Sequence, residues 1–405
     1  RSAAPAVARG SRARWWHTGT MRVLIVSDCY APRLGGIETQ VRDLARNLLA
    51  TGHEPAVVTA TPLGRGRGRS IERPDGFPVF RTTVSLPGEL PVHPRARREM
   101  ELLMGRLRPD VVHVHVGIVS PFAWSGIAAA RRLGLPIAIT FHCVPGQWAG
   151  AVGALGPLSP VRRWQRAGAD LTAVSSMLAR QVEAAGAQAP VGVLPNGITL
   201  ADWRLDRPAE GDGRRPLRVA ASLRLIERKR PLQVVRVFTS ATARCGDREA
   251  ELSMYGDGPL RARLAREAAA SSAAERISLV GRVERDELAR AFARADIYLQ
   301  ASTTESFGIS ALEARSAGLA VVALRTSTSG IGDFITDGVD GLLADDDAGL
   351  ADALASLLRD PGLLERIKEH NRAVAPLAEW GTVTGMNVSA YRRAVALRPG
   401  RRGPV

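Results

Sequence analysis

The chain has 405 residues, of which 45% are hydrophobic and 23% are charged, and its formal net charge is +15. This length exceeds what one ordinary core supports, so we expect two domains, and no apolar run reaches the roughly 18 residues that a membrane span requires. The three cysteines, Cys29, Cys143 and Cys245, are odd in number and lack metal-site spacing, which favours a reducing cytoplasm over a disulfide framework.

The two ends of the chain carry much of the positive charge. Residues 1–20 contain four arginines and no acid, and residues 390–405 contain five arginines and no acid. We interpret 1–20 and 396–405 as basic disordered tails, so the high net charge does not lead us to expect nucleic acid as a partner. Residues 1–20 also lack the apolar core of a secretion signal, which agrees with a cytoplasmic location.

From Met21 onward, short β-branched runs alternate with helical stretches, a pattern typical of parallel-sheet α/β domains. A helix is expected after the glycine-containing loop that follows the first strand, with an apolar face from Ile37 to Leu48 and an end at Gly52. The basic, glycine-rich connection 62–76 is expected to be mobile. The predicted strands of this first half are 22–27, 55–61, 110–116, 136–142, 171–175 and 191–195.

A break in composition at 204–216 predicts a linker, and a second α/β series follows it. We therefore predict an α/β fold of two Rossmann-like domains, 21–203 and 204–375, that face each other across a central cleft. A helix at 376–395 is expected to cross back to the first domain. Ligands of such sheets lie beyond the carboxyl ends of the strands. The predicted strands of the second half are 217–222, 250–256, 277–281, 296–302, 320–324 and 341–345.

Two glutamates eight positions apart follow the strand at 296–302. Glu305 lies in the loop at the end of that strand, and a helix is expected to begin near Phe307 or Gly308. Unpaired N–H groups at a helix start attract anions, and a glycine lets a phosphate approach the backbone. Glu313 lies about one and a half turns into this helix. An extended ligand could thus place a diphosphate at the helix start with hydroxyl groups near each carboxylate. The alternative is that Glu305 caps the helix and Glu313 is solvated.

A basic stretch follows the strand at 217–222. Arg224, Arg228, Lys229 and Arg230 precede Pro231, a residue that suits the first turn of a helix. The helix dipole disfavours cations there, and a bound anion would reverse that penalty. A solvated basic loop is the alternative interpretation.

With these motifs the chain resembles the glycosyltransferase group 1 family, retaining GT-B enzymes of sequence family 4. The resemblance extends over about 21–360, and its most specific part is the pair Glu305 and Glu313 with Phe307-Gly308 between them. The sequence departs from the family pattern at Thr199, where aspartate is usual, at Ala320, where proline is common, and at Asp333, where glutamate is more frequent.

The resemblance implies a donor site for a nucleoside diphosphate sugar. It implies that Arg224 and Lys229 neutralise the diphosphate, that Glu305 lies near the sugar hydroxyls and that Glu313 holds the ribose. Backbone groups are implied at Phe307, Gly308 and Ile309 for the phosphates, at Gly281 and Arg282 for the base, and at Gly35 and Gly36 for the phosphates from the first domain.

The resemblance also implies that His142 contacts the substrate near the reacting carbon; its catalytic set is thus His142, Arg224, Lys229 and Glu305. A hydrogen-bonded structural role is the alternative for a histidine at the end of an apolar strand. Cys143 has no readable base partner and is not expected to be a nucleophile. Because aspartate is an ordinary helix N-cap, Asp345–Asp347 are not expected to bind a metal.

The expected function is retaining transfer of a sugar, such as mannose or another hexose, from a GDP- or UDP-linked donor to a lipid, glycan or small-molecule acceptor bound by the first domain. We expect neither a metal nor a cofactor besides the donor. A nucleotide-sugar epimerase and a non-catalytic nucleotide-binding protein are alternatives. Basic residues around the helical stripe Met100–Leu107 and at 65–73 suggest an anionic membrane surface on the inner face of the plasma membrane as a further partner.

Overall fold

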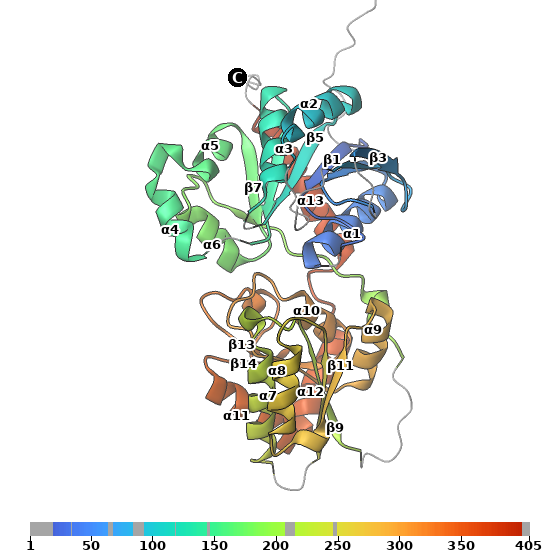
Figure 1. The fold of residues 1–405 in the computed structure, drawn as a ribbon, viewed down its shortest axis with the longest axis vertical. Coiled ribbons are helices and arrows are strands. Elements are labelled where there is room, and N and C mark those ends of the chain that lie inside the picture. Colours follow the sequence, from blue (N-terminus) through green and yellow to red (C-terminus); the bar gives the residue numbers. More distant parts are fainter. Residues whose placement is uncertain are drawn as a thin grey trace, which may run out of the picture.

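The computed structural model describes residues 19–398 apart from 34, 64–67, 84–92, 118, 144–145, 207–214 and 246–248. Within this part the chain forms two α/β lobes, one above the other in Figure 1. The predicted tail 1–20, most of the linker 204–216 and most of the tail 396–405 lie outside the described residues.

The N-terminal lobe is built on a sheet in the order β3-β4-β2-β1-β5-β6-β7-β8, parallel except for the pair β3–β4. Its strands are buried on both faces because helices cover each side, which explains their continuous Val and Ile runs. The strands are β1 (Arg22–Ser27), β2 (Glu54–Thr59), β3 (Gly68–Glu72), β4 (Val79–Thr83), β5 (Val111–Val116), β6 (Ile137–Phe141), β7 (Ala169–Ala173) and β8 (Gly192–Val193). The helices are α1 (Gly36–Ala50), α2 (Ala96–Leu107), α3 (Pro121–Arg132), α4 (Gly146–Ala154), α5 (Pro160–Arg166) and α6 (Ser176–Ala184).

The C-terminal lobe has a parallel sheet in the order β11-β10-β9-β12-β13-β14, the doubly wound arrangement. Its strands are β9 (Leu217–Ser222), β10 (Ala250–Tyr255), β11 (Ile277–Gly281), β12 (Ile297–Gln300), β13 (Ala320–Leu324) and β14 (Gly341–Ala344). Its helices are α7 (Pro231–Thr242), α8 (Arg261–Ala269), α9 (Arg285–Arg294), α10 (Ile309–Ser316), α11 (Asp347–Arg359) and α12 (Pro361–Ala373). The α/β prediction is confirmed.

The strand order identifies the ligand side of each lobe. In the N-terminal sheet the order reverses between β1 and β5, and in the C-terminal sheet it reverses between β9 and β12. Crevices at such switch points, beyond the carboxyl ends of the strands, are where doubly wound sheets bind ligands. The loops after β1, β9 and β12 are therefore the places to look for a site.

The last helix, α13 (Trp380–Ala396), belongs spatially to the N-terminal lobe, as Figure 1 shows. It packs against α1, β5, β6 and β7, and Tyr391 on it is fully buried. Arg393 extends the contact with an ion pair to Asp170 on β7, at 3.0 Å. The chain therefore crosses between the lobes twice, which ties their relative position at two points.

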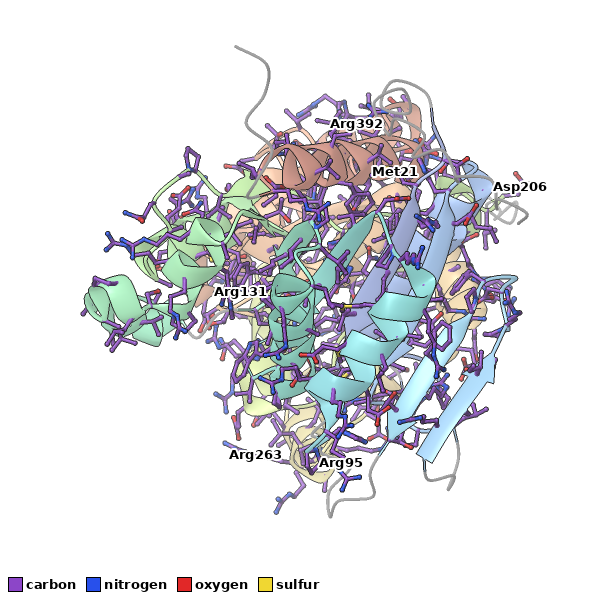
Figure 2. The ribbon with its side chains drawn as sticks, turned by 90° about the horizontal axis from the view of Figure 1, so that it is seen from above. Met21, Arg95, Arg131, Asp206, Arg263 and Arg392 are labelled. Carbon is purple, nitrogen blue, oxygen red and sulfur yellow. The ribbon has the colours of Figure 1, made fainter. Side chains whose placement is uncertain are left out.

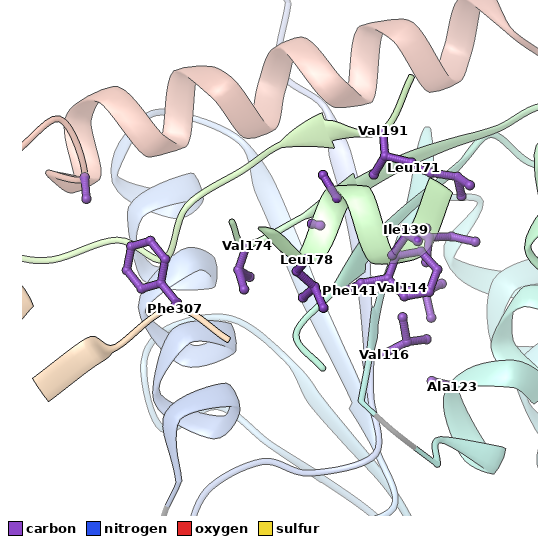
Figure 3. Close-up of a cluster of buried hydrophobic side chains, with 14 of the residues drawn as sticks. Val114, Val116, Ala123, Ile139, Phe141, Leu171, Val174, Leu178, Val191 and Phe307 are labelled. Atoms are coloured by element: carbon purple, nitrogen blue, oxygen red, sulfur yellow. The ribbon is translucent and has the colours of Figure 1, made fainter. Parts of the chain in front are cut away.

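One apolar cluster includes residues from both lobes. Phe307 of the C-terminal lobe belongs to the same cluster as Val174 and Leu178 of the N-terminal lobe, and Figure 3 shows the three side chains. The Phe307 ring also packs on Phe334, with centroids 5.0 Å apart. The bulky aromatic before the glycine at the start of α10 therefore has a structural role at the boundary of the lobes.

The connection 62–76, expected to be mobile, contains the edge strand β3, which pairs with β4. A buried arginine on β4 holds this edge in place: Arg81 pairs with Glu72 on β3 and donates to the backbone oxygens of Ala31 and Thr61. The part of the prediction that covers 68–72 was therefore wrong, because backbone pairing and a buried ion pair order a sequence that is polar throughout.

Among the described residues, no helix combines the length and the apolarity needed to cross a bilayer.

Candidate active site at the boundary of the two lobes

The predicted site residues all lie beyond the carboxyl ends of parallel strands. Gly35 and Gly36 begin α1 after β1, and His142 directly follows β6. In the C-terminal lobe, Arg224 and Lys229 follow β9, Gly281 ends β11 and Arg282 comes next, and Glu305 follows β12. The strands of both lobes thus direct these residues toward the same boundary.

Lys229 and Glu305 form an ion pair. Lys229 ends a short 3₁₀ turn, Glu227–Lys229, between β9 and α7, and its Nζ contacts Glu305 Oε2. Both side chains are largely buried, with exposed fractions of 18% for Lys229 and 14% for Glu305. The backbone of Glu305 is fixed as well, because its N–H donates to Thr328 O and its carbonyl accepts from Gly330 N–H. The structure thus joins one cation and one carboxylate that the sequence analysis assigned separately.

The start of α10 lies beside this pair. Gly308 is the N-cap of α10 with φ 99° and ψ 52°, the left-handed region in which a side chain is strained. Ile309 opens the helix, so its first N–H groups face the boundary without partners inside the helix. A positive helix end and a lysine close together form a site for an anion.

The glycine loop of the N-terminal lobe approaches α10 from the opposite side. A Cβ added to Gly36 would lie 2.9 Å from Ile309 Cδ1, so two helix N-termini from different lobes come close together. Nearby, Ser306 Oγ lies 3.7 Å from Cys143 Sγ, across the same boundary.

The other basic residues of the 222–231 stretch have separate fates. Arg224 is exposed and, within the described residues, its guanidinium contacts no acceptor. Arg230 does not join the site, because it forms two hydrogen bonds to Asp347 at 2.9 and 2.6 Å and one to Ala301 O at 3.1 Å. Its inclusion in the anion clamp was wrong: the start of α11 supplies it with a closer partner.

The three aspartates at 345–347 have ordinary roles. Asp346 is the N-cap of α11 and accepts from Gly349 N–H at 2.8 Å. Asp345 pairs with Arg325, and Asp347 pairs with Arg230.

Glu313 is partly buried on α10, and burial raises its pKa to about 7. The Arg285 guanidinium opposes this rise, whereas Asp43 of the other lobe adds to it. A carboxyl group with such a pKa is protonated in part at neutral pH, so a ligand hydroxyl that donates to it would favour its charged form.

Arg285 joins the lobes on this side of the site. It is the first residue of α9 and pairs with Asp43 on α1 at 3.4 Å and with Asp202 at 3.7 Å. Its guanidinium also lies over the buried Trp203 ring, 5.5 Å from the centroid. On the other side, Asp333 accepts hydrogen bonds from Ser176 N–H and Oγ–H, each 2.5 Å long, at the start of α6. The lobes are therefore in contact on both sides of the predicted site.

His142 is buried, and its Nε2 lies 2.8 Å from His115 Nδ1 on β5. Burial lowers its pKa to about 4, so the ring is neutral at physiological pH. Sequence reasoning placed His142 here but missed His115, Arg285 and Asp43. The two histidines in "HVH", at alternate positions of a buried strand and thus on one face, were the available signal.

Gly281 and Arg282 lie at the end of β11. Gly281 has φ 94°, and its carbonyl accepts from Gly256 N–H at 2.7 Å. Arg282 is exposed, and within the described part of the chain no side-chain contact links it to Lys229, Glu305 or Glu313.

A cavity of about 670 Å³ lies elsewhere, on the face of the C-terminal sheet beside α9. Its lining includes Arg218, Ser253 and Tyr255 and none of the predicted donor residues. Since ligands of doubly wound sheets lie beyond strand ends, we place the site at the boundary of the lobes instead.

Comparisons with known proteins agree with this geometry. Residues 206–374 match the family Glycosyl transferases group 1, and residues 34–202 match Glycosyltransferase Family 4. The chain is 29% identical to glycogen synthase of Mycobacterium tuberculosis, covering 95% of this chain and 97% of that protein. It is 29% identical to the GDP-mannose-dependent alpha-mannosyltransferase of the same species, covering 84% and 89%.

Solved structures show the same fold at low sequence identity. A glycosyltransferase from Rickettsia africae superposes with a TM-score of 0.71 at 17% identity, covering 93% of this chain and 99% of that one. Anabaena HepE, solved with UDP and glucose, gives a TM-score of 0.69 at 17% identity, covering 91% and 98%. Together with the two family matches, which follow each other along nearly the whole described chain, these likenesses identify the protein as an enzyme, a GT-B glycosyltransferase of group 1.

Proposed function

We propose that this enzyme transfers a hexose from a nucleoside diphosphate sugar to a glycan or lipid-linked acceptor, with retention of anomeric configuration. The observation that carries the proposal is the Lys229–Glu305 pair beside the start of α10, at the switch point of the C-terminal sheet. That place combines a cation, a positive helix end and a carboxylate, the groups needed to hold a diphosphate and an adjacent sugar hydroxyl.

The diphosphate would lie between Lys229, Arg224 and the first N–H groups of α10. The exposed Arg224 guanidinium is available to a ligand, whereas Lys229 is held in place by Glu305. Breaking the bond between sugar and diphosphate places negative charge on the leaving phosphate, and these donors would stabilise it in the transition state. We propose that the protein's own cations supply this stabilisation, with no metal ion and no further cofactor.

The remaining groups would position the rest of the donor. Glu313 would accept hydrogen bonds from the ribose, the backbone at Gly281 and Arg282 would meet the base, and Glu305 and His142 would contact the sugar. Gly35 and Gly36 let the N-terminal lobe approach the phosphates without side chains in the way. Glu305 and His142 come from different lobes, so this sugar site would be complete only when the lobes are in contact.

Retention follows if the acceptor attacks on the face that the diphosphate leaves, with a phosphate oxygen taking the acceptor proton. This route needs no separate base, and the neutral His142, with its pKa near 4, is poorly suited to act as one. A glycosidase would instead use two carboxyl groups about 5–9.5 Å apart on either side of one bond, and it would need no lysine at a phosphate site.

The decisive experiment is an incubation of the purified enzyme with UDP-, GDP- and ADP-linked hexoses, each with and without acceptors. The acceptor panel includes a glucan and an inositol lipid. The reason is that glycogen synthase and a further relative, the phosphatidylinositol N-acetylglucosaminyltransferase of Arabidopsis thaliana, differ in the acceptors that their names indicate. Proton NMR of the anomeric region follows donor and product. We expect product only when an acceptor is present, with the anomeric configuration of the donor retained.

The same experiment separates the alternatives. An epimerase would convert the donor without an acceptor, and a non-catalytic protein would bind a nucleotide but release no product. Inversion of the anomeric configuration would contradict the proposed mechanism.

We further propose that the outer face of α2 and the end of α3 contact an anionic membrane. Arg97, Arg98 and Arg106 are exposed on α2 together with Leu102, and Arg131 is exposed on α3. Figure 2 views the molecule from above and labels Arg95, next to α2, and Arg131. Co-sedimentation with vesicles containing phosphatidylglycerol should exceed that with phosphatidylcholine vesicles, and equal recovery with both would contradict this partner.

A further inference from the structure

Three buried histidines lie side by side in the N-terminal lobe, beneath the proposed sugar site. His113 and His115 are on β5, and His142 follows β6. The rings of His113 and His115 have centroids 4.1 Å apart, and those of His115 and His142 are stacked at 5.1 Å. Burial lowers the pKa of each ring, so all three are neutral and each carries one N–H.

The tautomer of His113 follows from the hydrogen bonds around it. Thr172 Oγ1–H donates to Ile139 O at 3.2 Å, so Thr172 Oγ1 accepts from Thr140 Oγ1–H. Thr140 Oγ1 must then accept from His113 Nε2–H, at 2.7 Å. His113 Nδ1 is left to accept from the Tyr391 hydroxyl of α13, at 2.9 Å. The proton positions in this chain of bonds are fixed by its end at a backbone carbonyl.

His115 and His142 share one hydrogen bond, between His115 Nδ1 and His142 Nε2, and two tautomers are compatible with it. If His142 donated, His115 would carry its N–H on Nε2. That atom is buried and has no hydrogen-bond partner within the described residues. A buried N–H without an acceptor is rarer and more costly than a buried lone pair without a donor. The favoured arrangement therefore has His115 Nδ1–H donating to His142 Nε2.

This arrangement determines what His142 offers to a ligand. Because Nε2 accepts from His115, the single N–H of the neutral His142 ring is on Nδ1. We propose that His115 is a positioning residue that fixes His142 as a neutral hydrogen-bond donor, with its Nδ1–H addressed to a hydroxyl of the bound sugar. The sugar contact rests on the proposed function, whereas the tautomer rests on the protein alone.

The direct test is a long-range ¹H–¹⁵N correlation spectrum of the full chain, labelled at histidine, in the absence of substrate. His142→Asn identifies the His142 signals by their disappearance. We expect the pattern of the Nδ1–H tautomer for both His115 and His142 and of the Nε2–H tautomer for His113, unchanged across neutral pH. An Nε2–H signal for His142, or a doubly protonated ring at pH 7, would overturn the proposal.

Two substitutions at His115 test the positioning role. His115→Asn retains an N–H donor close to the position of Nδ1, so the Nδ1–H tautomer of His142 should persist and kcat should stay within about threefold of wild type. His115→Phe retains the ring but removes the donor, so His142 should show a mixture of tautomers and kcat should fall by about tenfold, the value of one neutral hydrogen bond.

A matched control and a fold check complete the design. His53 lies away from the site and accepts from Met21 N–H, so His53→Asn should leave both spectrum and kcat unchanged. Circular dichroism and thermal melts confirm that each variant is folded. Full activity and an unchanged His142 tautomer in folded His115→Phe would overturn the positioning role. If the tautomers are as expected but His142→Phe transfers sugar at the wild-type rate, the contact with the sugar is wrong and the proton positions stand.

Discussion

The two lobes contribute opposite kinds of chemistry to the boundary between them. The C-terminal lobe supplies charged groups, with Lys229, Arg224 and Glu305 around the start of α10. The N-terminal lobe supplies neutral ones: glycines at the start of α1 and the histidines His115 and His142, whose burial keeps them uncharged. The difference indicates that one lobe holds an anionic donor, while the other contributes shape and hydrogen bonds without adding charge at the place where an acceptor would enter.

The largest expected effect comes from removing the cation of the C-terminal lobe. Lys229→Ala should lower kcat by about 100-fold or more, because charge stabilisation in the transition state is lost. Arg228→Ala is the matched control, since it removes the same charge from the adjacent exposed position and should retain near-native turnover. Equal losses in the two variants, measured by release of nucleoside diphosphate, would show that the net charge of the turn matters rather than the contact made by Lys229.

A second prediction tests whether the two lobes must meet. A Cβ added at Gly330 would lie 2.5 Å from Ser306 O and 2.6 Å from Ser175 Cβ of the other lobe, whereas one added at Gly332 would meet nothing within 4 Å. Gly330→Ala should therefore separate the lobes on this side and lower kcat by about tenfold, on the order expected when a catalytic arrangement is displaced by a fraction of an ångström. Gly332→Ala should be neutral in both activity and small-angle scattering. A fully active Gly330→Ala would indicate that contact between the lobes is dispensable.

Glu313 gives a prediction for pH dependence. Its pKa is raised from 4.5 to about 7 in the folded protein, so the folded state binds this proton more tightly than the unfolded chain does. Its contribution to stability is therefore fully present below pH 4.5 and is lost as the pH rises to about 7. Nucleotide affinity should change in the opposite direction, because only the carboxylate accepts two ribose hydroxyls.

Glu313→Gln should remove both trends. The measurements are chemical denaturation and nucleotide titration at pH 5.5 and 8, compared between the variant and wild type. Parallel pH profiles of the two proteins would contradict the raised pKa of Glu313.

The smallest expected effect concerns the contact across the boundary at Arg285. The side chain is one-third exposed, so its pairs with Asp43 and Asp202 should contribute only about 0.2–1 kcal/mol. Arg285→Ala should lower stability by this amount, and the same change in an Asp43→Ala background should cost less. Since Arg285 opposes the rise in the pKa of Glu313, the variant should also move the pH dependence of nucleotide affinity upward. Strict additivity of the two substitutions would show that the residues do not interact.

Local sequence features predicted most of the fold. Apolar runs located the central strands because these strands are buried on both faces. The strands β3 and β4 escaped because β3 is polar and largely exposed, and because Arg81 interrupts β4. That arginine is buried through partners on other segments, which no window of sequence reveals.

The candidate site divides in the same way. Gly308, Glu305 and Lys229 could be placed because each directly follows a recognisable strand or begins a helix. The pairs Arg285–Asp43 and Ser176–Asp333 join residues 242 and 157 positions apart in different lobes, so their meeting depends on how the lobes pack. Arg230 was misassigned for the same reason, because its partner Asp347 is 117 positions away.

The central claim is that the charged wall of the C-terminal lobe binds a nucleoside diphosphate. Isothermal titration of UDP, GDP and ADP into wild type, Lys229→Ala and His142→Asn tests it most directly. We predict that one nucleotide binds to the wild type, that Lys229→Ala weakens this binding by about 10- to 100-fold, the value of a charged hydrogen bond, and that His142→Asn leaves it unchanged. Binding that is lost in His142→Asn and retained in Lys229→Ala, or no binding of any of the three nucleotides to the wild type, would contradict the account.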